Sequence, residues 1–448
     1  MNRVTHNTQE MTAFEKTFHK RLRVFRAIVF CLFTALYVRL FSHSPYGPSH
    51  NLMKGIGYAT SVIWWYMKDK NYFDYALINL LIIIMAFSSV ALYNSQKYVQ
   101  VDGDFFKKQL TWFALSLIIM FLIFLLNMDV ITNLTPFIYG FGILALVFVL
   151  AAPDSIAPEI KGANSWIILP GLGSIQPSEF MKIFLILMLA YLIIKHAEKH
   201  PPGDLLYDLI LLGKLGAAAS LPIGLTLLQN DFGTSLVMFV ITCGVILVSG
   251  INWKYIVTCA LIGVLVVAVL VYIYLYNDEL LLSFLDTYQI NRIHAWLDPF
   301  GNAQGIGYQL KQSILSIGSG MTFGKGFGAS DVYVPEAHTD FIFAIIGEEF
   351  GFIGASILIC VYFSMIFRII GIGLSAQPFE SYFCAGVASL LFFHIFQNIG
   401  MVIGLLPITG IPLPLMSYGG SSVMATMLGI SIVLNISLKK RKYMFSKK

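Results

Sequence analysis

Val334 to Gly354 reads VPEAHTDFIFAIIGEEFGFIG, an apolar stretch that carries five ionisable side chains and no Lys or Arg. The five are Glu336, His338, Asp340, Glu348 and Glu349. An Asp at the centre of a membrane span costs roughly 2.5 to 3.5 kcal/mol, so acids placed in this way usually line a polar cavity. The stretch therefore predicts a functional site at the mouth and inside of a membrane helix.

The composition of the whole chain agrees with a membrane setting. Of its 448 residues, 57% are hydrophobic and only 12% are charged, and the mean hydropathy is +0.76. So few charged groups cannot cover the surface of a soluble protein of this size. The chain is therefore expected to be a multispan membrane protein of the all-α class.

Ten apolar runs are long enough to cross about 30 Å of hydrocarbon. They are residues 73–94, 109–127, 134–152, 180–196, 207–228, 232–250, 254–276, 341–367, 382–404 and 421–438. Two weaker runs, 24–41 and 52–67, precede them, and the second is short enough to lie in the interface. We expect ten core transmembrane helices, one or two additional N-terminal apolar segments, and a large extracellular loop between core helices seven and eight.

The basic residues predict the orientation of these spans. Lys and Arg crowd the N-terminal tail, the 68–70 turn, the 195–199 loop and the C-terminal KKRKYMFSKK. If all four face the cytoplasm, they agree with a single zigzag through the ten spans. Both termini are then cytoplasmic, and the three long loops 152–178, 277–339 and 404–422 are external. The net charge of +5 reflects this bias and indicates no nucleic-acid partner.

The chain divides accordingly into three parts: an N-terminal extension at 1–70, a membrane domain at 71–438 and a basic cytoplasmic tail at 439–448. The five cysteines are scattered through apolar runs without pairing or metal-ligand spacing. No disulfide framework is expected.

The third external loop contains LPITGIPLPLMSYGGSS, which begins at Leu406. Its three prolines remove amide donors and its three glycines permit positive φ, so it cannot be a continuous helix. Either it is a re-entrant loop that lines a cavity or it is an ordinary connector. Ser417 in this loop is a candidate supporting residue.

Two further motifs combine polar residues with the start of a span. In QPSEFMK, Glu179 and Lys182 are three residues apart on one helix face, where opposite charges can pair. The alternative is a first-turn dipole partner at Glu179 and a snorkelling side chain at Lys182. In QNDFGT, Asp231 is a candidate N-cap on the same outer side.

Asp340 also has two interpretations. An Asp before an apolar run is typical of a helix N-cap. A lone carboxylate can equally serve as a general base, with Glu336 or His338 tuning it or helping to bind a cation. Glu348 and Glu349 lie about 12 to 14 Å further along the helix, where one of them should face the protein interior.

Six motifs together resemble one known family. KGANSW, QPSEFMK, QNDFGT, GINWK, VPEAHTDFIFAIIGEEFGFIGA and LPITGIPLPLMSYGGSS occur in the order and topology of the SEDS proteins (shape, elongation, division and sporulation). This family includes RodA, FtsW and SpoVE. The resemblance covers about residues 73–438, and the RodA branch of Gram-positive bacteria is the most similar.

The resemblance implies a ten-helix peptidoglycan glycosyltransferase in the bacterial plasma membrane. It would polymerise lipid II into undecaprenyl-linked glycan at the outer face during elongation and cell-shape maintenance. Its partners would be a class B penicillin-binding protein and other elongation or division machinery. A division role like that of FtsW, a lipid II flippase and a scaffold protein are the alternatives.

The resemblance also assigns roles to residues. Asp340 matches the essential Asp of the family and would be the catalytic base. Glu179, Lys182 and Trp166 match other functional positions. Lys182, Arg292 or a divalent cation such as Mg²⁺ or Mn²⁺ would balance the diphosphate of the substrate, and no metal site is assigned with certainty.

Overall fold

The structure is a computed structural model. It describes residues 74–96, 104–160, 162–169, 173–199, 205–276, 287–301 and 306–445, together with Lys20, Arg21 and Val24. Except for Val24, the two predicted N-terminal segments 24–41 and 52–67 lie outside the described residues, as does the 68–70 turn.

Nine helices in the described part of the chain are long and apolar enough to cross a membrane. They are α3 (Tyr75–Ser95), α4 (Phe105–Leu125), α5 (Met128–Ala151), α6 (Pro177–Ala197), α7 (Leu205–Leu228), α9 (Trp253–Tyr276), α13 (Ile342–Gly373), α14 (Pro378–Val402) and α15 (Gly420–Phe445). The remaining predicted span corresponds to α8 (Phe232–Val248), an apolar helix of 17 residues. The prediction of a polytopic all-α membrane protein is therefore confirmed.

Acidic side chains and prolines fix the first turns of several helices. Asp74, Asp104 and Asp231 cap α3, α4 and α8, where each carboxylate accepts a backbone N–H of the first turn. Pro177 and Pro378 begin α6 and α14, at positions where a missing amide proton loses no hydrogen bond.

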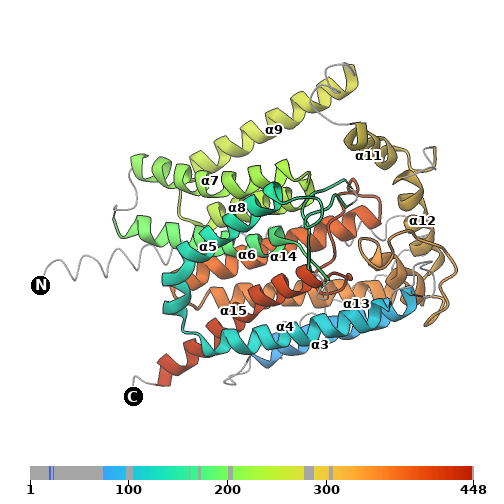
Figure 1. Cartoon of the computed structure of the whole chain (residues 1–448), viewed down its shortest axis with the longest axis horizontal. Coiled ribbons are helices and arrows are strands. Elements are labelled where there is room, and N and C mark those ends of the chain that lie inside the picture. The colour runs from blue at the N-terminus through green and yellow to red at the C-terminus, as the bar shows by residue number, and fades with distance from the viewer. Residues whose placement is uncertain are drawn as a thin grey trace, which may run out of the picture.

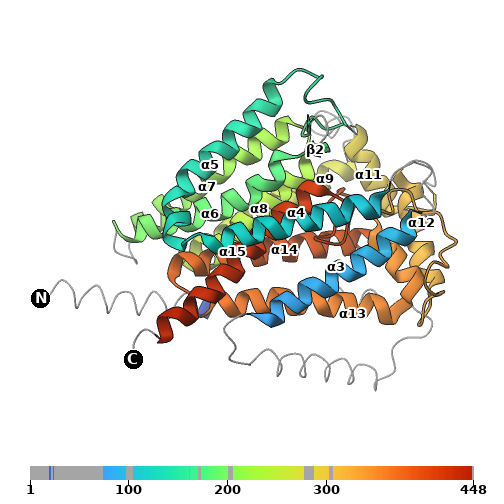
Figure 2. The same cartoon turned by 60° about the horizontal axis from the view of Figure 1, so that its bottom comes forward.

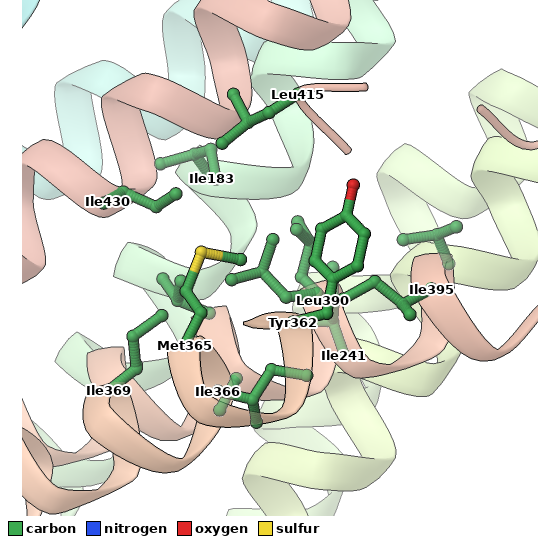
Figure 3. Packing of buried hydrophobic residues seen from close by; sticks show 14 of the residues in the cluster. Ile183, Ile241, Tyr362, Met365, Ile366, Ile369, Leu390, Ile395, Leu415 and Ile430 are labelled. Carbon is green, nitrogen blue, oxygen red and sulfur yellow. The ribbon is translucent and has the colours of Figure 1, made fainter. Parts of the chain in front are cut away.

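The helices run roughly along one direction, with α14 in the middle of the bundle (Figure 1). Helices α14 and α15 are largely buried, whereas α9 has no buried residue and lies along one edge. Tyr362 of α13 packs among Leu390 and Ile395 of α14 in the apolar core (Figure 3).

The long connections gather at the end of the bundle away from the C-terminus (Figures 1 and 2). The first of the three long loops contains an antiparallel hairpin of β1 (Ile167–Leu169) and β2 (Gly173–Ile175). The second contains α11 (Thr287–Leu297) and α12 (Ile306–Ser319). The third, residues 403–419, has no regular structure, as its prolines predict.

Candidate functional site

The third loop, residues 403–419 and here called the Pro-rich loop, is buried inside the bundle. Ile411, Leu413 and Leu415 are almost wholly inaccessible. The Tyr362 hydroxyl donates to the Pro414 carbonyl at 2.7 Å. Tyr362 lies 11 residues after Gly351, where α13 is broken, and 11 residues before its end at Gly373, so the loop folds back to the middle of that helix segment. It is therefore a re-entrant loop and not an ordinary connector.

Side chains of the surrounding helices hold the carbonyls of the Pro-rich loop. A carbonyl away from water costs several kcal/mol if it lacks a donor, so an irregular segment at membrane depth needs such partners. Seven side chains donate to loop carbonyls at 2.8 to 3.2 Å. The pairs, donor first, are Trp296 and Gly404, Gln397 and Pro407, Arg292 and Ile408, Asn398 and Ile411, His394 and Pro412, Ser88 and Met416, and Gln109 and Ser417.

Asp340 lies against this loop. The amide nitrogen of Asn398 donates to both the Asp340 and the Ile411 carbonyls at 2.8 Å. A Cβ atom at Gly410 would lie 3.6 Å from Asp340 Oδ2, so the carboxylate faces the loop at a point that lacks a side chain. Helix α13 begins at Ile342 with Phe341 at the N-cap and no capping side chain. The N-cap interpretation of Asp340 is therefore wrong.

Glu336 and His338 shape the turn that carries Asp340. Glu336 has φ 56°, and its carboxylate accepts the Thr339 hydroxyl at 3.0 Å. The ring of His338 stacks on Phe105 with centroids 4.4 Å apart, and its carbonyl accepts the Tyr418 amide at 2.9 Å. The turn is thus attached both to α4 and to the end of the Pro-rich loop.

Glu179 and Lys182 form a buried ion pair at 2.8 Å. Both side chains are almost inaccessible, so the predicted pairing is confirmed and the snorkelling interpretation of Lys182 is wrong. Lys182 Nζ also lies 3.1 Å from His394 Nε2, and His394 Nδ1 lies 3.2 Å from the Pro412 carbonyl. Since an ammonium and a carbonyl face the two ring nitrogens, Nε2 accepts and Nδ1 donates.

Asp231 caps α8, as predicted, and joins two other segments to it. Its Oδ1 accepts the Thr234 amide at 3.1 Å, while Oδ2 accepts Gln176 Nε2 at 2.8 Å and the Ser178 hydroxyl at 3.2 Å. A Cβ atom at Gly233, in the same first turn, would lie 3.2 Å from the Thr409 carbonyl. The start of α8 therefore packs against the Pro-rich loop.

Glu348 and Glu349 are both buried and attach the segment 320–334 to α13. Glu348 accepts Ser316 Oγ at 2.8 Å and Lys325 Nζ at 2.6 Å. Glu349 accepts Asn94 Nδ2 at 2.5 Å and Ser330 Oγ at 3.1 Å. One of the two was expected to face the interior, and the structure buries both.

Lys325 has a second carboxylate neighbour, Asp331. Desolvation opposes its charge, but its hydrogen bonds to Asp331 and Glu348 outweigh this and raise the pKa of Lys325. The same hydrogen bond lowers the pKa of the exposed Asp331 carboxyl. Lys325 is thus held as a cation beside Glu348.

Of the remaining predicted residues, Arg292 and Ser417 lie at the Pro-rich loop, and Trp166 lies in the first long loop. Nη1 of Arg292, on α11, donates to the Ile408 carbonyl at 3.2 Å. Ile408 is two residues from Gly410. The Ser417 hydroxyl accepts the Leu413 amide at 2.8 Å and so stabilises the loop itself. Trp166 is half-buried just before β1. Its neighbour Ser165 is joined to Gln176 at 3.4 Å.

The sequence interpretation missed His394, Gln397 and Asn398. All three lie on α14, and their spacing of three and four residues places them on one face of an otherwise apolar span. Polar residues arranged in this way inside a membrane helix usually mark a functional face. This spacing in the sequence was the signal that could have identified them.

No group of three or more His, Cys, Asp or Glu side chains able to hold a metal ion occurs among the residues that the structure describes. The charged groups that the structure brings to the Pro-rich loop are Asp340, Arg292 and, through His394, the Glu179–Lys182 pair.

A family model of cell cycle proteins, FtsW/RodA/SpoVE, matches residues 70–442. The chain belongs to the FtsW/RodA/SpoVE family. Among similar members, the probable peptidoglycan glycosyltransferase FtsW of Neisseria gonorrhoeae is 35% identical over 84% of this chain and 87% of its own length. The peptidoglycan glycosyltransferase MrdB of Escherichia coli K12 is 34% identical over 83% of this chain and 95% of its own.

Solved structures of FtsW/RodA/SpoVE proteins share the fold. One chain from a peptidoglycan synthase complex that coordinates polymerization and crosslinking superposes with a TM-score of 0.67, at 29% identity, over 82% of this chain and 98% of its own. The rod shape determining protein RodA of Thermus thermophilus gives a TM-score of 0.59, at 27% identity, over 82% of this chain and 97% of its own.

Proposed function

We propose that this protein is a peptidoglycan glycosyltransferase that polymerises lipid II, with Asp340 as its general base. The observation that carries the proposal is the position of the Asp340 carboxylate, which faces Gly410 of a re-entrant loop instead of capping its helix. Relatives that cover most of the chain carry the name peptidoglycan glycosyltransferase, which supports the same activity.

The reaction needs a base and a cation. The acceptor 4-hydroxyl attacks the anomeric carbon of the donor sugar, the bond from that carbon to the diphosphate oxygen breaks, and undecaprenyl pyrophosphate leaves. Asp340 takes the proton of the attacking hydroxyl, which raises the nucleophilicity of its oxygen. A positive group near the diphosphate stabilises the charge that develops on the leaving group.

Arg292 is the better placed of the two basic side chains that were predicted to balance the diphosphate. It is half-buried and its guanidinium reaches the Pro-rich loop two residues from Gly410. Lys182 is almost inaccessible and already paired with Glu179 and His394. We assign binding of the diphosphate to Arg292. Lys182 instead supports the Pro-rich loop through His394.

We further infer that the site opens at the outer face, that both termini are cytoplasmic, and that residues 71–438 form the catalytic membrane domain. A role in elongation, with a class B penicillin-binding protein as partner, is supported by the likeness to RodA and to a chain of a synthase complex. Complementation of strains depleted of either RodA or FtsW tests this choice. Rescue of rod shape alone is the expected result.

The activity itself is tested with purified protein and lipid II, with and without the penicillin-binding partner. Glycan polymer resolved on a gel is the expected product. A parallel assay of lipid II movement across liposomes separates polymerisation from transport. Transport without any polymer contradicts the proposal.

A further inference from the structure

Two side-chain contacts between α3 and α13 mark the two surfaces of the membrane layer. These helices lie side by side (Figure 2). Asn94 donates to Glu349 at 2.5 Å near one end, and Arg368 donates to both oxygens of Asp74 at 2.9 Å near the other. The contacts are 20 residues apart on α3, which is a continuous helix between them. At 1.5 Å per residue this is about 30 Å, the thickness of the hydrocarbon core.

With the orientation proposed above, on which this inference rests, Glu349 lies at the outer boundary of the hydrocarbon, and the segment 320–334 is attached to α13 at that level. Met321 accepts the Phe352 amide at 2.9 Å through its carbonyl, and Gly326 donates its amide to the Glu349 carbonyl at 3.0 Å. The backbone of α13 is free to make these hydrogen bonds because the helix is broken at Gly351, with φ 60° and ψ −159°.

The part of this segment that bonds to α13 presents large apolar side chains to the outside. Met321, Phe323 and Phe327 are 68%, 80% and 60% exposed. Burial in an apolar medium stabilises a side chain of this size by about 1.5 to 3 kcal/mol relative to water. The backbone and side chains of this segment make seven or more hydrogen bonds, most of them to α13. The three apolar side chains therefore form a rigid projection.

This projection continues the apolar outer surface of α3. Tyr75, Ile82 and Tyr93 are exposed and are spaced by seven and eleven residues, which places them on one stripe of that helix. The ring of Tyr93 stacks on Phe327, with centroids 6.4 Å apart and planes 4° apart. The stripe faces the lipid along α3, and Phe327 extends it beyond the last turn.

We propose that Met321, Phe323 and Phe327 form an interfacial anchor that inserts into the outer leaflet at the boundary between headgroups and acyl chains. Aromatic side chains favour this depth, and the contiguity with the lipid-facing stripe of α3 makes lipid the occupant. The anchor sets the height of the outer loop above the membrane. Through Ser330 and Val332, which bond to Glu349 and Glu348, it also fixes the chain that leads to Asp340.

The anchor is tested by the depth of spin labels in the full chain, with its five native cysteines replaced by alanine and the protein in phosphatidylglycerol and phosphatidylethanolamine nanodiscs. Labels are placed by Phe323→Cys and, independently, by Phe327→Cys. Ser155→Cys, at an exposed position of the first external loop, is the matched control. Power-saturation EPR compares collisions of each label with oxygen and with a water-soluble nickel chelate.

At both anchor positions we expect collisions with oxygen to exceed collisions with nickel, and at Ser155 the reverse. Nickel accessibility at Phe323 and Phe327 equal to that at Ser155 overturns the proposal, because the side chains are then in water. Shielding from both reagents also overturns it, because the surface is then covered by protein from a second copy.

Discussion

At the scale of single residues, the buried charges of α6 and α14 depend on one another. The carboxylate of Glu179 neutralises Lys182, and His394 uses its two ring nitrogens to connect that ammonium to the Pro412 carbonyl. Spacing along the helix predicted the Glu179–Lys182 pair. It did not predict His394, which is 212 residues away in sequence and reaches Lys182 only through the packing of α6 on α14.

Removal of one member of this pair leaves an uncompensated buried charge. Lys182→Met is expected to lower the free energy of unfolding by about 3 to 5 kcal/mol. The double variant with Glu179→Leu should recover most of that loss, because two apolar side chains need no partner. Thermal unfolding in detergent measures both variants. A single variant as stable as the wild type contradicts the role of the pair.

At the scale of elements, the break in α13 and the Pro-rich loop are the two irregular features that build the site. The Pro-rich loop was predictable, because Pro407, Pro412 and Pro414 exclude a helix whatever surrounds them. The break at Gly351 was not, since a lone glycine in an apolar run is compatible with a straight helix. Its conformation follows from backbone contacts with residues 321–326, which only the folded chain brings together.

Gly351 has a backbone conformation that is almost restricted to glycine. Gly351→Ala is expected to cost about 1 to 3 kcal/mol from the dihedral angles alone. The added Cβ atom would also contact the Gly324 amide nitrogen, so the segment 320–334 should loosen. Limited proteolysis and the midpoint of thermal unfolding measure the effect.

Gly371→Ala is the matched control in the same helix. A Cβ atom at Gly371 meets nothing within 4 Å, and alanine favours helix by up to about 1 kcal/mol. We expect this variant to be as stable as the wild type or slightly more so. Equal effects on stability and proteolysis at the two glycines would mean that the break in α13 does not hold the segment 320–334.

At the scale of the whole molecule, the bundle consists of a packed centre and a lipid-exposed edge. Hydropathy predicted the membrane spans, but it did not separate buried spans from exposed ones, because α9 is the most apolar of the nine candidate spans in the described residues and yet has no buried residue. In lipid there is no hydrophobic drive between helices, so packing and polar contacts decide which spans are central. The polar residues of α14 mark it as the centre.

The difference between the packed centre and the exposed edge predicts that the same Leu→Ala substitution destabilises one and not the other. Leu391→Ala in α14 leaves a cavity at a fully buried position and should cost about 2 to 5 kcal/mol. Leu265→Ala in α9, where the side chain is 63% exposed, should leave the stability of the bundle almost unchanged. Thermal unfolding in the same detergent compares them. A larger loss at Leu265 contradicts the observed packing.

If Asp340 removes the proton of the attacking hydroxyl, binding and turnover should separate in Asp340→Asn. We expect its lipid II affinity to stay close to that of the wild type and its rate of glycan formation to fall by about 10²- to 10⁴-fold. Asp154→Asn, at an exposed acid of the first long loop, should keep the wild-type rate. Polymerisation by Asp340→Asn at the wild-type rate would mean that Asp340 is not the base.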